Sequence, residues 1–428
     1  MKITSNFSTI IAVAATGALA LSACGGGDPV SATEDDSVEL RFSYWGGGLR
    51  VEQTDAIIEA FEAEYPHISV SSEYADFGGH WDQLATQTAG GDTPDIIQMD
   101  DKYLREYADR GVLLDLTDVD VSQFDEDSVD NGRTENGLFG ITTGINSLAL
   151  GANPDLFEEA GIAMPDDTTW TWDDFAELTV ELNANLDGAY ATNETNEPGG
   201  FQVWLRQEGK HLTTEQGELG FEEEDLAEYY TYWLDLLNDG GMPAADTMSE
   251  NRSADPEQQL IHTGRVALAP MWTSSLAGIS ESAGVDMELL RFPSKTGQAE
   301  DNGLWYKSSM FLSGAASTDH PEEVQLFIDY VVNDLDAALL GLTDRGLPSN
   351  QEAREAVLEA IDEQDLKSAE FIEEIEDELA GPEPVPALGF SEIQNLMLRY
   401  EDELYFERMG PDEAASSAMA EMELAIQQ

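Results

Sequence analysis

The stretch Leu84–Asp100 (LATQTAGGDTPDIIQMD) decides the fold class of this 428-residue chain. A short helix is expected over Trp81–Ala89, and a buried strand over Asp95–Met99 follows Pro94. The neighbouring segments continue the alternation of strand and helix, over Val38–Trp45, Val51–Tyr65, Ile68–Tyr74 and Tyr103–Arg110. This β-α-β-α-β order predicts an α/β fold with a parallel sheet and helices on both of its faces.

The rest of the chain is richer in helix. Thr171 is expected to cap a helix, with Asp174 at the capping-box position. Apolar periodicity predicts the other elements: helices with apolar stripes at 226–237 and 324–332, a short strand over Val266–Met271, and a nearly continuous helical pattern over Gln351–Gln428 that breaks at Gly381-Pro382.

Length and charge restrict the class of protein. A chain of 428 residues favours two domains rather than one core. With 19 Lys and Arg against 87 Asp and Glu, its net charge is −68, so it repels nucleic acid and anionic membranes. Salt shortens the Debye length from about 8 Å at 0.15 M to about 3 Å at 1 M. We therefore interpret the acidity as an adaptation to a saline, halophilic habitat; the alternative is the ordinary acidity of secreted proteins.

Cysteine and histidine are scarce. The single cysteine, Cys24, excludes an intramolecular disulfide and any cysteine-clustered zinc or iron–sulfur site. The five histidines are scattered along the chain. We therefore expect no metal site and no cofactor.

The N-terminus resembles an export signal. The apolar run Ile10–Leu21 is shorter than the roughly 20 residues that a membrane span needs, and it has the length of a signal-peptide core. Leu21–Gly25 (LSACG) resembles the bacterial lipobox, in which cleavage precedes the cysteine and a lipid is attached to it. We expect a signal peptide over 1–23, lipidation of Cys24 and a flexible tether over 24–37. The mature protein would be anchored by its lipid to the extracytoplasmic face of the cell membrane.

Seven motifs follow one another in a characteristic order: Tyr44–Gly48, Phe61–Val70, the AGGDTPD passage within Leu84–Asp100, Gly140–Asn146, Asn153–Gly161, Gly264–Trp272 and Arg345–Pro348. Together they resemble extracellular solute-binding protein family 1, the binding lipoproteins of carbohydrate ABC importers, which include maltose-binding protein. The resemblance covers roughly residues 38 to 350.

The resemblance implies a two-lobed periplasmic-binding-protein-like fold of type II, each lobe a mostly parallel sheet flanked by helices. It places the N-terminal lobe at 38–147 plus 303–346 and the C-terminal lobe at 148–302 plus 347–428. The ligand would lie between the lobes, in agreement with ligand binding beyond the carboxyl ends of strands. It implies a non-enzymatic protein, which we expect to be a monomer, that captures an oligosaccharide and delivers it to the membrane permease of the importer.

Stacking on indole rings and hydrogen bonding to hydroxyls are the two ways of holding a sugar. Aromatic candidates are Trp45, Trp81, Trp204, Trp272, Trp305 and Tyr306, and each has an ordinary core position as its alternative. We expect Ala at Trp272 or Trp305 to weaken binding with little loss of fold. The candidates for hydrogen bonding or for close approach of the backbone to the ligand lie near strand ends and the lobe crossing. They are Gly46, Asp76, Asp100, Asp101 and Asn146.

Basic residues are rare, so their positions carry information. Arg206, Lys307 and Arg345 lie in motifs that flank the expected cleft, and Arg50 follows the triple glycine. One interpretation is recognition of an acidic, uronate-containing oligosaccharide, because guanidinium groups pair bidentately with carboxylates. The other is salt bridging to the surrounding acids.

Two further classes remain open. A lipid-anchored carbohydrate-active enzyme would use two carboxylates about 5–9.5 Å apart, but with 87 acids such a pair has no diagnostic value. The chain has no Gly-x-Ser-x-Gly or His-Glu-x-x-His motif. A binding protein for a non-sugar solute such as a peptide would rely more on backbone polar groups than on stacked tryptophans.

Overall fold

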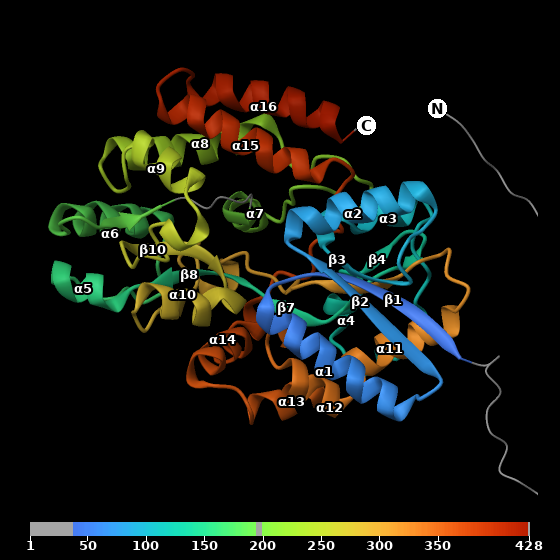
Figure 1. The fold of residues 1–428 in the computed structure, drawn as a ribbon. Helices are drawn as coiled ribbons and strands as arrows, with labels where there is room; N and C mark the ends of the chain where they lie inside the picture. The colour runs from blue at the N-terminus through green and yellow to red at the C-terminus, as the bar shows by residue number, and fades with distance from the viewer. Residues whose placement is uncertain (1–36, 194–198, 427–428) are drawn as a thin grey trace, which may run out of the picture. The chain divides into compact units, whose positions relative to one another are not determined.

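The computed structural model describes residues 37–193 and 199–426, and the first strands of the chain belong to a five-stranded sheet (Figure 1). The strand order is β2-β1-β3-β13-β6. The first three strands are parallel, as predicted, whereas β13 runs antiparallel to both β3 and β6. Their bounds are β1 (Val38–Trp45), β2 (Ile68–Ala75), β3 (Ile96–Met99), β6 (Ile141–Thr142) and β13 (Phe311–Gly314).

Helices cover both faces of this sheet, as the sequence predicted. Leu40 and Ile96 point to the face covered by α1 (Gly48–Glu64) and α11 (Pro321–Asn333). Ile97 and Met99 point to the other face, which is covered by α2 (Phe77–Gly90) and α3 (Asp101–Asp109). The alternation follows from the two-residue period of a strand. We call these two clusters together the first core.

A second sheet, of order β11-β8-β10-β9, lies in a second core. Its strands are β8 (Leu148–Ala152), β9 (Tyr190–Thr192), β10 (Val266–Trp272) and β11 (Glu288–Leu290). Only β9 pairs in parallel, whereas β8 is antiparallel to both β10 and β11. The sheet is thus less parallel than the sequence led us to expect, because the chain reaches β8 from the first sheet through a short strand and not through a crossover helix.

Three short strands connect the two sheets. They are β7 (Gly144–Asn146), β12 (Lys307–Ser308) and β14 (Leu347–Pro348), and they form an antiparallel sheet of order β12-β7-β14. β7 leads from β6 to β8, and β12 leads from β11 back to β13. The exact boundaries of two lobes remain a prediction.

Helices build most of the second core. Thr171 caps α6 (Trp172–Asn185) in a capping box with Asp174, as predicted. Around it lie α7 (Gly199–Arg206), α8 (Glu223–Asn238), α14 (Glu363–Glu374), α15 (Phe390–Tyr405) and α16 (Pro411–Ala425). The remaining α-helices are α4 (Glu126–Asp130), α5 (Pro154–Ala160), α9 (Ala245–Ser253), α10 (Leu276–Ala283), α12 (Leu335–Gly341) and α13 (Gln351–Leu358).

The expected signal peptide over 1–23 and the lipidated Cys24 lie outside the described residues. Within residues 37–193 and 199–426, no helix is both long and apolar enough to cross a membrane.

Candidate functional site

A small cavity of about 50 Å³ lies where elements of the two cores face one another. One wall comes from the first sheet and its helices, the other from the second core, and the segment 383–386 contributes to both. The cavity combines indole faces with amide, hydroxyl and charged groups. Its lining includes Asp101, Lys102, Asn131, Gln202, Thr213, Trp272, Trp305, Lys307, Phe311, Glu383, Pro384, Val385, Pro386 and Phe390.

Two of the predicted tryptophans meet in this cavity. Trp272 ends β10 and is half-buried, whereas Trp305 is only 2 % exposed. Their rings are perpendicular, with centroids 6.2 Å apart. The guanidinium of Arg206 lies 5.2 Å from the ring centroid of Trp305, and the ammonium of Lys307 lies 5.5 Å from that of Trp272. The indoles are therefore fixed by neighbours before any ligand enters.

Charged groups gather at the start of α3. Asp100 caps this helix by accepting a hydrogen bond from the backbone N–H of Lys102 at 3.1 Å. Lys307 Nζ lies 3.0 Å from Asp101 Oδ2. Burial and then the neighbouring Asp101 raise the pKa of Asp100 to about 7. Burial acts on Asp101 as well, but Lys307 and a hydrogen bond with Asp100 outweigh it and lower the pKa of Asp101.

Arg206 lies behind the cavity wall in a buried ion pair with Glu383. The guanidinium also donates to the carbonyls of Gly303 and Gly381 at 3.0 and 2.5 Å. Glu383 Oε2 lies 2.9 Å from His211 Nδ1. The charge of Arg206 is thus neutralised within the protein and its donors already have acceptors.

The segment Gly381–Pro386 joins the two sides of the cavity. Arg206 holds its first part, as described above. Arg105 of α3 holds its last part, donating to the carbonyls of Val385 and Pro386 at 2.9 and 3.0 Å. The Val385 side chain is buried within the first core. The sequence marked a helix break here, but nothing in it identified this segment as a cavity wall.

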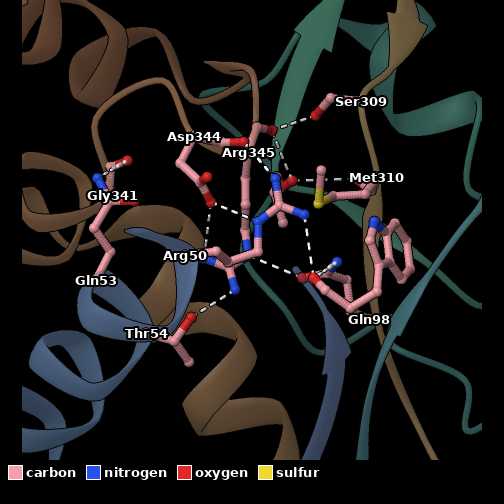
Figure 2. Close-up of polar contacts among 11 residues, drawn as sticks. Arg50, Gln53, Thr54, Gln98, Ser309, Met310, Gly341, Asp344 and Arg345 are labelled. Carbon is pink, nitrogen blue, oxygen red and sulfur yellow. Dashed lines mark hydrogen bonds and ion pairs between the residues drawn. The ribbon is translucent and has the colours of Figure 1, made fainter. Parts of the chain in front are cut away.

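Arg345 and Arg50 lie outside the cavity, in a polar cluster around Asp344 (Figure 2). Arg345 donates to Gln98 Oε1 at 3.1 Å and to Thr54 Oγ1 at 2.7 Å. Arg50 donates to Asp344 Oδ2 at 2.6 Å. Burial and then the nearby Arg50 lower the pKa of Arg345 to about 10. This cluster connects α1 and β3 to the loop before β14.

Four candidates lie at the carboxyl end of the first sheet, outside the lining of the cavity. Trp45 packs edge-on against Phe77 at 5.3 Å, and Trp81 stacks on Tyr103 at 3.9 Å between centroids. Asp76 caps α2 by accepting from the Gly79 N–H at 2.7 Å. A Cβ atom at Gly46 would lie 2.5 Å from Arg50 Cδ, so close packing accounts for this glycine.

Three further candidates have structural partners and do not line the cavity. The amide of Asn146 donates to Ser274 Oγ at 3.0 Å and accepts from Thr273 Oγ1 at 2.6 Å. The Tyr306 hydroxyl donates to the Ile372 carbonyl at 2.9 Å. Trp204 is buried in the second core beside Trp172, with centroids 5.2 Å apart.

The structure therefore brings together Asp101, Trp272, Trp305 and Lys307 from the predicted set, with Asp100 and Arg206 adjoining them. Sequence reasoning missed Lys102, Asn131, Gln202, Thr213 and Glu383, which also line the cavity. Of these, only Lys102 could have been predicted from the sequence, because it directly follows the candidates Asp100 and Asp101. Among the described residues, no group of three His, Cys, Asp or Glu side chains is placed to hold a metal ion.

Comparison with known proteins identifies the family. The family model for bacterial extracellular solute-binding proteins matches residues 47–335. The chain belongs to this family. An uncharacterised lipoprotein of Streptomyces antibioticus is 25 % identical over 354 residues, covering 78 % of this chain and 75 % of the relative. The arabinooligosaccharide-binding protein of Bacillus subtilis is 23 % identical over 216 residues, covering 48 % of this chain and 49 % of the relative.

A solved structure extends the likeness to nearly the whole solute-binding protein. The periplasmic oligogalacturonide-binding protein of Yersinia enterocolitica, in complex with saturated digalacturonic acid, has a TM-score of 0.77 at 23 % identity. The match covers 91 % of this chain and 99 % of that one. The two-lobed α/β fold expected from the sequence is thereby confirmed.

Proposed function

We propose that this solute-binding protein captures an oligosaccharide in the cavity between its two lobes and delivers it to the permease of an ABC importer. The observation that carries the proposal is the pair of perpendicular indoles, Trp272 and Trp305, in the lining of this cavity. Sites for small ligands typically combine apolar walls with a few polar groups, as the lining of this cavity does.

The polar lining complements hydroxyl groups. Asn131, Gln202 and Thr213 present amides and a hydroxyl, which both donate and accept hydrogen bonds. The indole of Trp272 offers an apolar face to the C–H groups of a sugar ring. The names of relatives agree with this chemistry, since they bind arabinooligosaccharides and oligogalacturonides.

The alternative of a carbohydrate-active enzyme is less well supported. Both carboxylates that line the cavity, Asp101 and Glu383, are held in ion pairs. A glycosidase would need one such group free to protonate the leaving oxygen. A peptide as the ligand is disfavoured by the tryptophans in the lining.

The proposal includes a location. Cleavage before Cys24 and lipid attachment there would anchor the protein to the extracytoplasmic face of the cell membrane, with the acidic body held off the surface by residues 24–37. Myristoyl-like single chains bind membranes only marginally, whereas two anchoring signals bind stably. The lipoprotein relative from Streptomyces supports this location. We expect the body to act as a monomer.

Ligand capture without turnover is the first prediction. A matching oligosaccharide is expected to shift tryptophan fluorescence and to raise the melting temperature, because binding at 100 times Kd stabilises the folded state by roughly 2.7 kcal/mol. The measurement is a thermal-shift screen of neutral and acidic oligosaccharides, with chromatography of the bound sugar afterwards. Shorter sugars in that chromatogram would contradict the binding function and support the enzyme.

Salt dependence is the second prediction. Repulsion among the 87 acidic side chains opposes the compact state and is screened at molar salt. The melting temperature is therefore expected to rise when sodium chloride increases from 0.1 to 2 M. A neutral osmolyte at matched osmolality serves as the control for excluded-solute effects. A melting temperature that stays flat in salt would remove the support for a halophilic origin.

A further inference from the structure

Lys102 differs from the other basic residues that the structure describes. Each of the other Lys and Arg side chains among the described residues makes an ion pair or a hydrogen bond, mostly to a carboxylate. They are Arg41, Arg50, Arg105, Arg110, Arg133, Arg206, Lys210, Arg252, Arg265, Arg291, Lys295, Lys307, Arg345, Arg354, Lys367, Arg399 and Arg408. The Lys102 ammonium makes no ion pair or hydrogen bond within residues 37–193 and 199–426, although Asp100 and Asp101 attract it electrostatically. Lys102 is one of the residues that line the cavity. In a chain with a net charge of −68, a lysine that makes neither an ion pair nor a hydrogen bond is an exception.

The acids around Lys102 have other partners as well. Asp101 is paired with Lys307, and Glu383 is paired with Arg206. Asp100, whose carboxylate caps α3, is the remaining acid beside it, and burial disfavours its charged form. The group formed by Asp100, Asp101, Lys102 and Lys307 is neutral when Asp100 is ionised and carries one net positive charge when Asp100 is protonated.

The position of Lys102 is also costly to the helix. It lies in the first turn of α3, where the positive end of the helix dipole disfavours a cation. No hydrogen bond of the Lys102 ammonium within the described residues offsets this cost, and the attraction of Asp100 and Asp101 opposes it. An anion that enters the cavity would interact favourably with both the ammonium and the helix end.

We infer that Lys102 forms an ion pair with a carboxylate of the ligand, so that the captured oligosaccharide is acidic and contains a uronate residue. This inference rests on the proposed function, since it names the substrate class of the same cavity. It also assigns recognition of the acidic sugar to a residue other than those that the sequence singled out. The sequence pointed to Arg206, Lys307 and Arg345. Arg206 is paired with Glu383, and Lys307 is paired with Asp101. Arg345 donates hydrogen bonds to Gln98 and Thr54.

Paired ligands that differ only in charge provide the test. Digalacturonate and diglucuronate, each with its uncharged methyl ester, are titrated by calorimetry against the wild type, Lys102→Met and Lys102→Arg. The wild type is expected to bind at least one acid about 10–100-fold more tightly than its ester, the range typical of a hydrogen bond to a charged group. Lys102→Met is expected to lose this preference and to bind the ester as before, whereas Lys102→Arg keeps most of it.

The matched control is Lys367→Met. This change removes the same charge, but Lys367 lies outside the cavity in pairs with Asp286 and Glu288. It is expected to leave both affinities unchanged, which separates a local pair from the overall field. An unchanged preference in Lys102→Met, or tighter binding of neutral oligosaccharides than of acids by the wild type, would overturn the inference and leave the proposed function intact. Failure to bind any acidic or neutral oligosaccharide would instead count against the proposed function.

Discussion

Replacement of Trp305 by alanine is expected to lower the free energy of unfolding by about 3–5 kcal/mol, the usual cost of truncating a buried aromatic side chain to alanine. The ring is 2 % exposed and belongs to the second core. Its removal would leave a void between Trp272 and the guanidinium of Arg206. Urea unfolding followed by circular dichroism measures the loss.

Trp272→Ala is the matched variant, because Trp272 contacts Trp305 but is itself half-buried. We expect Trp272→Ala to lower the free energy of unfolding by less than about 1.5 kcal/mol, because a half-buried ring contributes less buried apolar area than a fully buried one. We expect its ligand Kd to rise roughly 30-fold, which corresponds to the loss of about 2 kcal/mol at a central aromatic contact. Calorimetry with the oligosaccharide found in the thermal-shift screen measures this effect.

These two variants revise the expectation drawn from the sequence, which treated both tryptophans as tolerant of alanine. Equal loss of stability in the two would show that Trp272 is as structural as Trp305. Unchanged affinity in a folded Trp272→Ala would remove that ring from the ligand site.

The sequence predicted the first sheet well because its signals are local. The alternation in Val38–Trp45 and the apolar run at Asp95–Met99 gave β1 and β3 to within one residue. Thr171 and Asp174 formed the predicted capping box for the same reason. The second sheet was less predictable, because the direction of β8 depends on how the chain arrives through β7 and not on the composition of either strand.

The candidate site depends on contacts between distant residues, which a single sequence does not display. Trp45 and Trp272 both end strands, yet only Trp272 lines the cavity. Arg206 and Glu383 are 177 positions apart, so the pairing of that arginine was invisible among 87 acids. Val385 enters the first core from a segment whose sequence indicated only a helix break.

The ion pair of Arg206 leads to the second large expected effect. Arg206→Met is expected to lower the free energy of unfolding by about 3–5 kcal/mol, because it leaves a buried carboxylate without its partner. The side chains of Arg206 and Glu383 are only 1 % and 12 % exposed, so water cannot replace the guanidinium. The carbonyls of Gly303 and Gly381 would lose their donors as well.

A double variant separates these causes. Arg206→Met combined with Glu383→Leu is expected to recover part of the loss, because the unpaired charge is gone, although the two carbonyls still lack donors. Arg399→Met is the control, since its pair with Glu421 is about half exposed on both sides and pairs of that kind contribute about 0–1 kcal/mol. Urea midpoints of the four proteins give the comparison.

If Arg206→Met kept its stability but lost affinity for the oligosaccharide, the guanidinium would act on the ligand and not on Glu383. The segment Gly381–Pro386 would then have to be held over the cavity by Arg105 and Val385 alone.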